Sequence, residues 1–106
     1  MFRFINKVKV GNIYTKYNFE LSNLVFIKWE PKCSTDIHNH DGKKCKFIVL
    51  NGSLHEARYK DKYLGSVYSS KCIEPLKYTT MRPEDGYHQM FNHDDRIKYS
   101  IHRYYD

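Results

Sequence analysis

Turn-forming residues recur at short intervals along this chain, and the runs between them are only five to ten residues long. The turn signals are pairs and clusters of Gly, Asn, Asp and Pro, including Asn51-Gly52 and residues 83–86. Short runs bounded in this way and rich in Val, Ile, Tyr and Phe are typical of strands in a β-sandwich or barrel. We therefore predict strands over residues 24–29, 45–50, 53–59, 76–80, 87–91 and 96–105.

The composition supports an all-β fold. Ten Tyr and six Phe suit pleated, half-buried surfaces, and 106 residues suffice for one core. The sequence predicts a single small jelly-roll-like β-barrel of antiparallel strands over residues 1–106. Because Asn-Gly is the strongest short hairpin signal, we also expect residues 45–50 to pair with 53–59.

Cysteine usage and the N-terminal segment indicate a location. The three Cys form no CxxC pair, so they are not a disulfide framework, and they fit a reducing compartment. The opening MFRFINKVKV has no apolar stretch long enough for a signal peptide, and no membrane span follows. We expect a cytoplasmic protein with no membrane partner.

The formal net charge of +6 raises the question of a nucleic-acid partner. The Lys and Arg residues are scattered singly and interspersed with Asp and Glu, which favours a solvated basic surface. We therefore predict no nucleic-acid partner, and a small basic nucleic-acid-binding barrel is the weaker alternative. A basic protein would also attract small anionic substrates.

Three histidines are candidates for chemistry. His38 and His40 are two residues apart and would share one face of a strand. Taken alone, such a pair is as consistent with a surface pair as with metal ligation. The pair begins the segment H38-N-H40-D-G-K-K-C45-K-F-I-V-L-N-G52, and a later segment reads P83-E-D-G86-Y-H88-Q-M-F-N92.

These two segments resemble the two sequence motifs of the cupin superfamily. The first motif is HxH followed by an acidic ligand and then Gly, and Cys45 stands where most cupins carry Glu. The resemblance implies that His88, rather than His93, is the third ligand. Three imidazoles with open positions suit iron, copper, nickel or zinc, and the open face suits dioxygen and substrate on iron(II).

Cysteine in place of the motif's Glu resembles the thiol dioxygenases, and among them cysteine dioxygenase. The segment S100-I-H102-R-Y104 is similar to that family's Ser-x-His-x-Tyr triad, and alternation places the three side chains on one strand face. Y14-T-K16 resembles the family's Tyr-Thr-Arg. The family's Cys–Tyr thioether crosslink would map onto Cys45 and Tyr104.

The resemblance implies that the protein acts in cysteine metabolism, and it implies a role for each of these residues. His38, His40 and His88 would hold Fe(II), and dioxygen would convert a small thiol to its sulfinic acid, with cysteine as the leading candidate substrate. Tyr104, oriented by His102 and Ser100, would hydrogen-bond to substrate or oxygen. Two further residues, Tyr14 and Lys16, would meet the substrate carboxylate.

Departures from the family pattern leave alternatives open. Lys16 offers a point charge where Arg offers a bidentate fork, so 3-mercaptopropionate, cysteamine and protein N-terminal cysteine are alternative substrates. The chain also ends two residues after Tyr104, where family members continue. A metal-binding cupin module without turnover, with a ligand-binding or regulatory role, is the alternative function. A homo-oligomer whose second subunit closes the pocket is also consistent with the sequence.

Overall fold

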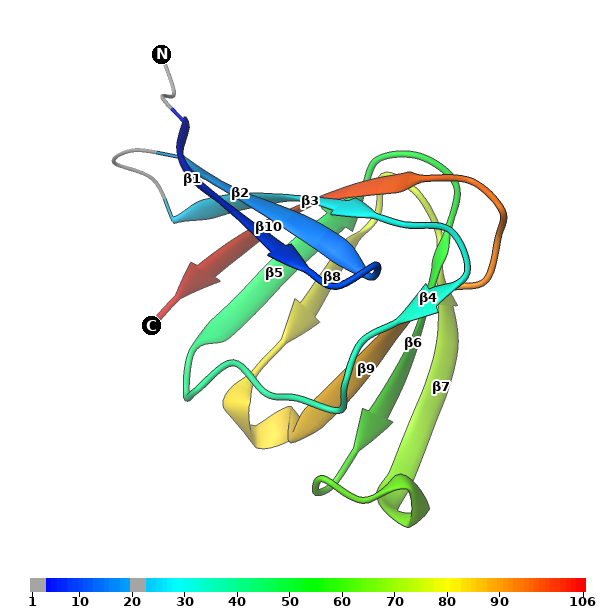
Figure 1. The fold of residues 1–106 in the computed structure, drawn as a ribbon. Helices are drawn as coiled ribbons and strands as arrows, with labels where there is room; N and C mark the ends of the chain where they lie inside the picture. The colour runs from blue at the N-terminus through cyan, green and yellow to red at the C-terminus, as the bar shows by residue number, and fades with distance from the viewer. Residues whose placement is uncertain (1–3, 20–22) are drawn as a thin grey trace.

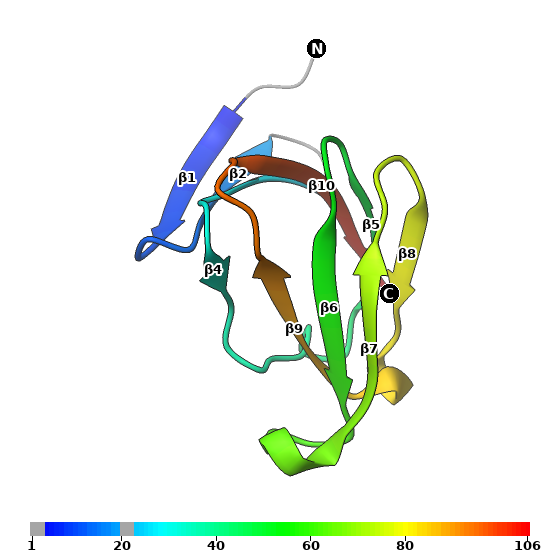
Figure 2. The ribbon, with the colours of Figure 1, turned by 90° about the vertical axis from the view of Figure 1, so that its right-hand side faces the viewer.

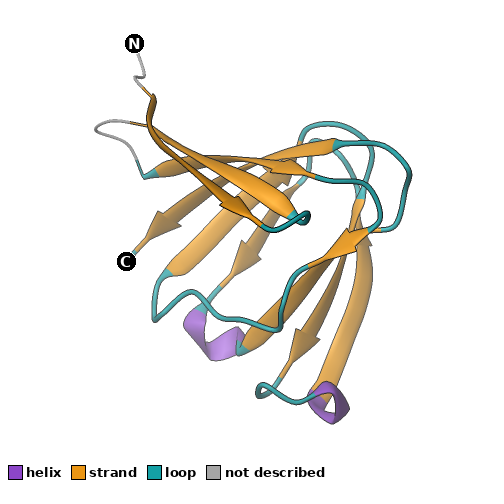
Figure 3. Cartoon of the chain, in the orientation of Figure 1, coloured by secondary structure: helices purple, strands orange, loops and turns teal. Residues whose placement is uncertain are grey.

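The computed structural model describes residues 4–19 and 23–106, and the described chain folds into two antiparallel sheets with two short 3-10 helices (Figures 1 and 3). Residues 1–3, at the start of the segment considered for a signal peptide, and 20–22 lie outside the described residues. The helices are η1 (Leu64–Ser66) and η2 (Pro83–Asp85). No helix in the described part of the chain is long and apolar enough to cross a membrane.

One sheet has six strands and the other four. The six-stranded sheet has the order β1 (Phe4–Val10), β2 (Tyr14–Phe19), β3 (Leu24–Trp29), β10 (Lys98–Tyr105), β5 (Lys44–Val49) and β8 (Tyr78–Met81). The four-stranded sheet has the order β4 (Cys33–Ser34), β9 (Tyr87–Asn92), β6 (Leu54–Tyr59) and β7 (Val67–Ile73). The prediction of an all-β, antiparallel fold is therefore confirmed.

The two sheets face each other, as the perpendicular views show (Figures 1 and 2). Burial alternates along β3, β5 and β9, because successive side chains of a strand point to opposite faces. The inward positions form one apolar core between the sheets, which includes Ile27, Trp29, Phe47, Val49 and Met90.

All six predicted runs contain strands, although their ends shift by up to two residues. The sequence analysis did not predict β1, β2, β4 or β7. In β7 only the last residue is buried, so its sequence VYSSKCI lacks the apolar alternation that marks a strand with one covered face.

The predicted hairpin between residues 45–50 and 53–59 is wrong. β5 pairs with β10 and β8, whereas β6 pairs with β7 and β9, so the turn at Asn51-Gly52 crosses from one sheet to the other. The Asn51 side chain binds the neighbouring strand instead of closing a hairpin. Its Oδ1 accepts a hydrogen bond from the Tyr99 amide at 2.7 Å, and its Nδ2 donates to the Ile97 carbonyl at 3.0 Å.

Gly52 is required at this turn, and Gly52→Ala is expected to destabilise the fold by about 2 kcal/mol. The residue has φ +65°, and an added Cβ would lie 2.5 Å from Nζ of the buried Lys98, which is held by Asp94 and the Ser53 carbonyl. Urea denaturation measures the loss. Gly65→Ala is the control, because Gly65 has no positive φ and an added Cβ meets nothing within 4 Å. Equal effects of the two substitutions would contradict this assignment.

Candidate metal centre

Three histidine side chains converge at the open end between the sheets. His38 and His88 form a two-way backbone bridge, with N–H···O distances of 2.9 and 2.8 Å. The ring centroid of His40 lies 5.5 Å from that of His38 and 4.8 Å from that of His88. One nitrogen atom from each of the three rings lies within 4.8 Å of the corresponding atoms of the other two. The structure thus brings together the three residues that the sequence analysis selected as metal ligands.

The backbone reason for this convergence differs from the prediction. His38 and His40 are not in a regular strand: His38 makes a single isolated bridge, and His40 lies in the irregular segment before β5. Their rings meet because the bridge to His88 holds the first residue and a turn holds the second. In that turn the Lys43 amide donates to the His40 carbonyl at 3.1 Å, and Asp41 and Gly42 have positive φ values.

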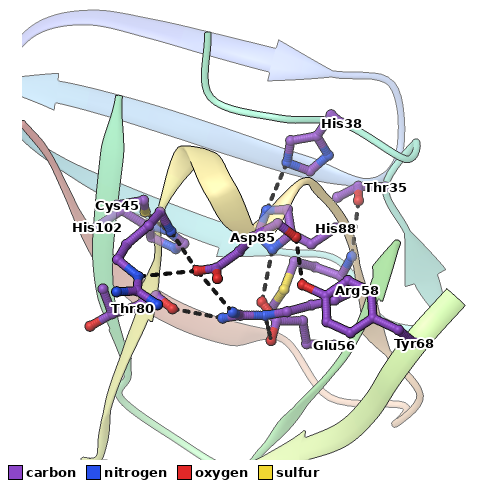
Figure 4. Close-up of polar contacts among 12 residues, drawn as sticks. Thr35, His38, Cys45, Glu56, Arg58, Tyr68, Thr80, Asp85, His88 and His102 are labelled. Atoms are coloured by element: carbon purple, nitrogen blue, oxygen red, sulfur yellow. Dashed lines mark hydrogen bonds and ion pairs between the residues drawn. The ribbon is translucent and has the colours of Figure 1, made fainter. Parts of the chain in front are cut away.

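The hydrogen bonds of His38 and His88 leave one nitrogen on each ring for a cation. Nδ1 of His38 lies 2.8 Å from the Asp36 carbonyl, and Nδ1 of His88 lies 2.9 Å from the Glu56 carboxylate. Both partners only accept hydrogen bonds, so each neutral ring carries its proton on Nδ1. The two Nε2 lone pairs then face each other at 3.1 Å (Figure 4). Two nitrogens each about 2.1 Å from one ion would have a comparable separation, so these residues fit a transition metal.

Burial keeps the ligand candidates neutral. It lowers the pKa of His38 to about 4 and that of His40 to about 3, and the neighbouring His88 adds to both effects. Neutral imidazole is the form that binds a metal ion. At pH 7 these two rings therefore need to lose no proton before they bind.

The lowered pKa values predict a pH-dependent stability of the metal-free protein. Below pH 6.5 the unfolded chain takes up protons at His38 and His40, whereas the folded chain resists protonation down to about pH 4 and 3. Stability is therefore expected to fall as the pH is lowered from 6.5 towards 4. Thermal melting at several pH values in the presence of a chelator measures this. The pH dependence should be weaker in His38→Ala/His40→Ala, and an equal dependence would refute the explanation.

A buried carboxylate that the sequence analysis missed supports His88. Glu56 on β6 is fully buried, and it accepts hydrogen bonds from His88 and from Nε of Arg58, both at 2.9 Å (Figure 4). Burial alone would raise the pKa of Glu56, but these two partners outweigh it and lower the pKa. Arg58 also lies 3.3 Å from Asp85 and donates to the Thr80 carbonyl at 2.7 Å.

The sequence did contain a signal for Glu56. Leu54 and Glu56 share one face of a predicted strand, and that face points into the core. An acidic residue at an inward position needs partners, because an unpaired buried charge is costly. Only the paired strands reveal that the partners are His88 and Arg58.

A polar chain along β10 reaches the same region. Nε1 of Trp29 donates to Oγ of Ser100 at 2.8 Å, and Oγ of Ser100 lies 2.7 Å from Nε2 of His102. Nδ1 of His102 lies 3.9 Å from Sγ of Cys45. Tyr104 is the direct cross-strand partner of Cys45, and its ring lies edge-on to His40 with 5.3 Å between centroids.

Burial keeps this chain in its neutral forms. It raises the pKa of Cys45 to about 12, and it also raises the pKa of Tyr104. It lowers the pKa of the fully buried His102 well below the usual value. At neutral pH the Tyr104 phenol therefore carries its proton and is available as a hydrogen-bond donor.

A cavity of about 230 Å³ lies over the three histidines. Lys16 enters it from β2, with Nζ 5.5 Å from the Tyr14 ring centroid, and the Tyr14 ring packs against Trp29. The lining consists of Tyr14, Lys16, Ile27, Trp29, Thr35, His38, Asn39, His40, Asp41, His88, Met90, His102 and Tyr104. Seven of the nine predicted site residues are in this lining. The other two, Ser100 and Cys45, are fully buried behind it.

The overall fold is similar to that of solved cupins. The Drosophila melanogaster CENP-C cupin domain matches with a TM-score of 0.71 at 14% identity, over 95% of this chain and 74% of that one. An oxalate oxidase in complex with the substrate analogue glycolate matches with a TM-score of 0.62 at 17% identity, over 76% of this chain and 40% of that one. AerE from Microcystis aeruginosa matches with a TM-score of 0.70 at 16% identity, over 96% and 46%. The fold is that of a cupin, and the match spans less than half of the oxalate oxidase and AerE chains.

The sequence places the chain more narrowly within the cupins. The profile of the cysteine dioxygenase type I family matches residues 5–106, which is nearly the whole chain. The protein belongs to this family of metal-dependent cupin enzymes.

Proposed function

We propose that the protein is an iron(II)-dependent thiol dioxygenase that converts a small thiol, cysteine first, to its sulfinic acid. The observation that carries the proposal is the set of three histidine nitrogens within 4.8 Å of one another beneath a cavity, in a chain of the cysteine dioxygenase type I family. The reaction adds both atoms of one dioxygen molecule to the thiol sulfur, so no external reductant is needed.

The three histidines would hold the iron, and the iron would offer open positions to the thiolate and to dioxygen. The carboxylate of Glu56 would balance part of the positive charge through the hydrogen bond to His88. Tyr104 would donate its phenolic hydrogen bond towards the substrate or oxygen. His102, which is hydrogen-bonded to Ser100 and stacks with the Tyr104 ring, would help to hold Tyr104 in place.

Lys16 and Tyr14 would select the substrate. Lys16 is the basic side chain in the lining of the cavity, so a thiol with a carboxylate would gain an ion pair there. Cysteine and 3-mercaptopropionate carry this group and cysteamine lacks it. We therefore expect cysteamine to be the poorest of the three substrates.

Oxygen uptake by the iron-loaded protein tests the proposal. Each of the three thiols is supplied under air, oxygen is followed with an electrode, and the sulfinate is identified by mass spectrometry. Protein loaded with zinc is the control, because zinc is redox-inert. Stoichiometric formation of sulfinate with iron alone supports the proposal. Iron-bound protein that consumes no oxygen with any thiol would refute it and would favour a cupin module that retains a metal without turnover.

The thioether crosslink between Cys45 and Tyr104 is a further prediction. The two residues are direct cross-strand partners on β5 and β10. Oxidative coupling by dioxygen would remove one hydrogen from each side chain. A fraction of the protein should therefore have an intact mass lower by two hydrogen atoms after turnover. Cys45→Ala should abolish that fraction, whereas Cys72→Ala, at an exposed site, should retain it. An unchanged mass after many turnovers would contradict the crosslink.

A further inference from the structure

The six-stranded sheet, whose strand arrangement Figure 1 shows, gathers on its outer face cations that are far apart in the sequence. None of its six strands contains Asp or Glu. Strand alternation and register place six basic residues on this face, and we call them the basic face: Lys7, Lys9, Lys28, Lys44, Lys46 and Arg103. All except the half-buried Lys28 are exposed.

The positive charge of the basic face is not balanced by acidic side chains within the described chain. Among the described residues, none of its six cations forms an ion pair with an acidic side chain. Elsewhere several cations have acidic partners, such as Lys32 with Asp95 and Lys77 with Glu74, although exposed Lys60 and Lys71 also form no ion pair with a described acidic residue. Much of the net charge of +6 is therefore concentrated on one side of the molecule.

Aromatic rings lie between these cations. Arg103 lies over Tyr105 with 5.7 Å to the ring centroid, and Lys46 lies over Tyr78 at 5.4 Å. Phe26 stacks on a further Tyr ring of the same face at 5.4 Å. Tyr78 is 74% exposed, so one ring face is open to a ligand.

We propose that the basic face binds single-stranded nucleic acid. Cations on a sheet would follow the phosphates, and exposed rings between them would stack on unpaired bases. A duplex keeps its bases stacked inside and would use only the charges. A membrane surface would need protruding apolar side chains to insert, whereas here the rings are mainly tyrosines. The sequence analysis predicted no such partner because the cations are scattered along the chain, and it is the sheet register that collects them.

Fluorescence anisotropy with a labelled oligothymidylate of about 16 nucleotides, a length typical of single-strand binding sites, tests the proposal. Lys46→Gln/Arg103→Gln should weaken binding at physiological salt and reduce the slope of log affinity against log salt by about 1.4. The matched control is Lys60→Gln/Lys71→Gln, which removes the same charge from exposed positions away from this sheet. If both pairs of substitutions weakened binding equally, binding would depend only on the net charge of the protein and not on this face, and the proposal would be overturned.

A second pair of variants tests the stacking. Tyr78→Ala should weaken binding about fivefold or more, and Tyr63→Ala should not, although both rings are 74% exposed. Duplex of the same length and vesicles of phosphatidylcholine with phosphatidylserine are the competing probes. Absence of oligothymidylate binding, or tighter binding of either competing probe, would overturn the proposal. The basic face and the cavity lie on opposite sides of the sheet. A negative result in these binding experiments would therefore not contradict the thiol dioxygenase proposal, and absence of thiol oxidation would not contradict nucleic-acid binding.

Discussion

His40→Ala is expected to abolish thiol oxidation and to weaken iron binding by more than about 100-fold. Loss of an outer-shell partner of a metal ligand alone costs about 10- to 100-fold, and this substitution removes a ligand. The fold should survive, because His40 lies in an irregular segment between strands and its side chain is only part-buried. Iron content is measured after dialysis, affinity by competition with a chelator, and activity by oxygen uptake.

The matched control for this experiment is His93→Ala. His93 is an exposed imidazole beside His55, with 5.4 Å between ring centroids, and it lies outside the cavity lining. It should leave iron content and oxygen uptake unchanged. If His40→Ala retained normal iron affinity and turnover, the assignment of the three-histidine centre would be wrong. If both variants lost iron equally, the metal would be bound at more than one place.

Glu56→Ala is expected to destabilise the metal-free protein by about 3–5 kcal/mol and to lower metal affinity by about 10- to 100-fold. The substitution leaves a cavity, removes the acceptor for Nδ1 of His88 and deprives Arg58 of its closest carboxylate. The first effect is measured by urea denaturation in chelator and the second by metal competition. Two separate readouts distinguish loss of stability from loss of ligand orientation.

The conservative variant separates charge from geometry. Glu56→Gln keeps an acceptor for His88 without the negative charge, so it should restore part of the metal affinity while Arg58 remains undercompensated. Glu74→Gln is the surface control, because Glu74 pairs with Lys77 in full contact with solvent and exposed pairs contribute little. A Glu56→Ala protein with unchanged stability and metal affinity would show that the buried network does not support His88.

Local signals in the sequence account for six of the ten strands in the described chain and for most of the site. The runs at 24–29 and 87–91 are short, contain apolar and aromatic residues and are bounded by turn-forming residues, and these signals depend only on nearby positions in the chain. The histidine spacings and the Ser100, His102 and Tyr104 alternation are likewise local patterns. Seven of the nine residues selected in this way line one cavity.

Other features depend on which strands pair, and sequence distance does not reveal this. Asn51-Gly52 has the chemistry of a hairpin turn, but the strands on its two sides belong to different sheets: β5 pairs with β10 and β8, and β6 pairs with β7 and β9. His38 meets His88 through a bridge across 50 residues, and a turn brings His40 beside them, so strand alternation does not bring the three together.

The sequence by itself determined the fold class, six of the strand-forming runs and the identity of the three histidines, because each is encoded in a short run between turn signals or in a short motif. Tertiary structure alone decided the strand partners, the support of His88 by Glu56 and Arg58, and the gathering of scattered lysines on one face. These features arise from contacts between residues far apart in the chain, and such contacts exist only once the two sheets have formed and set their registers.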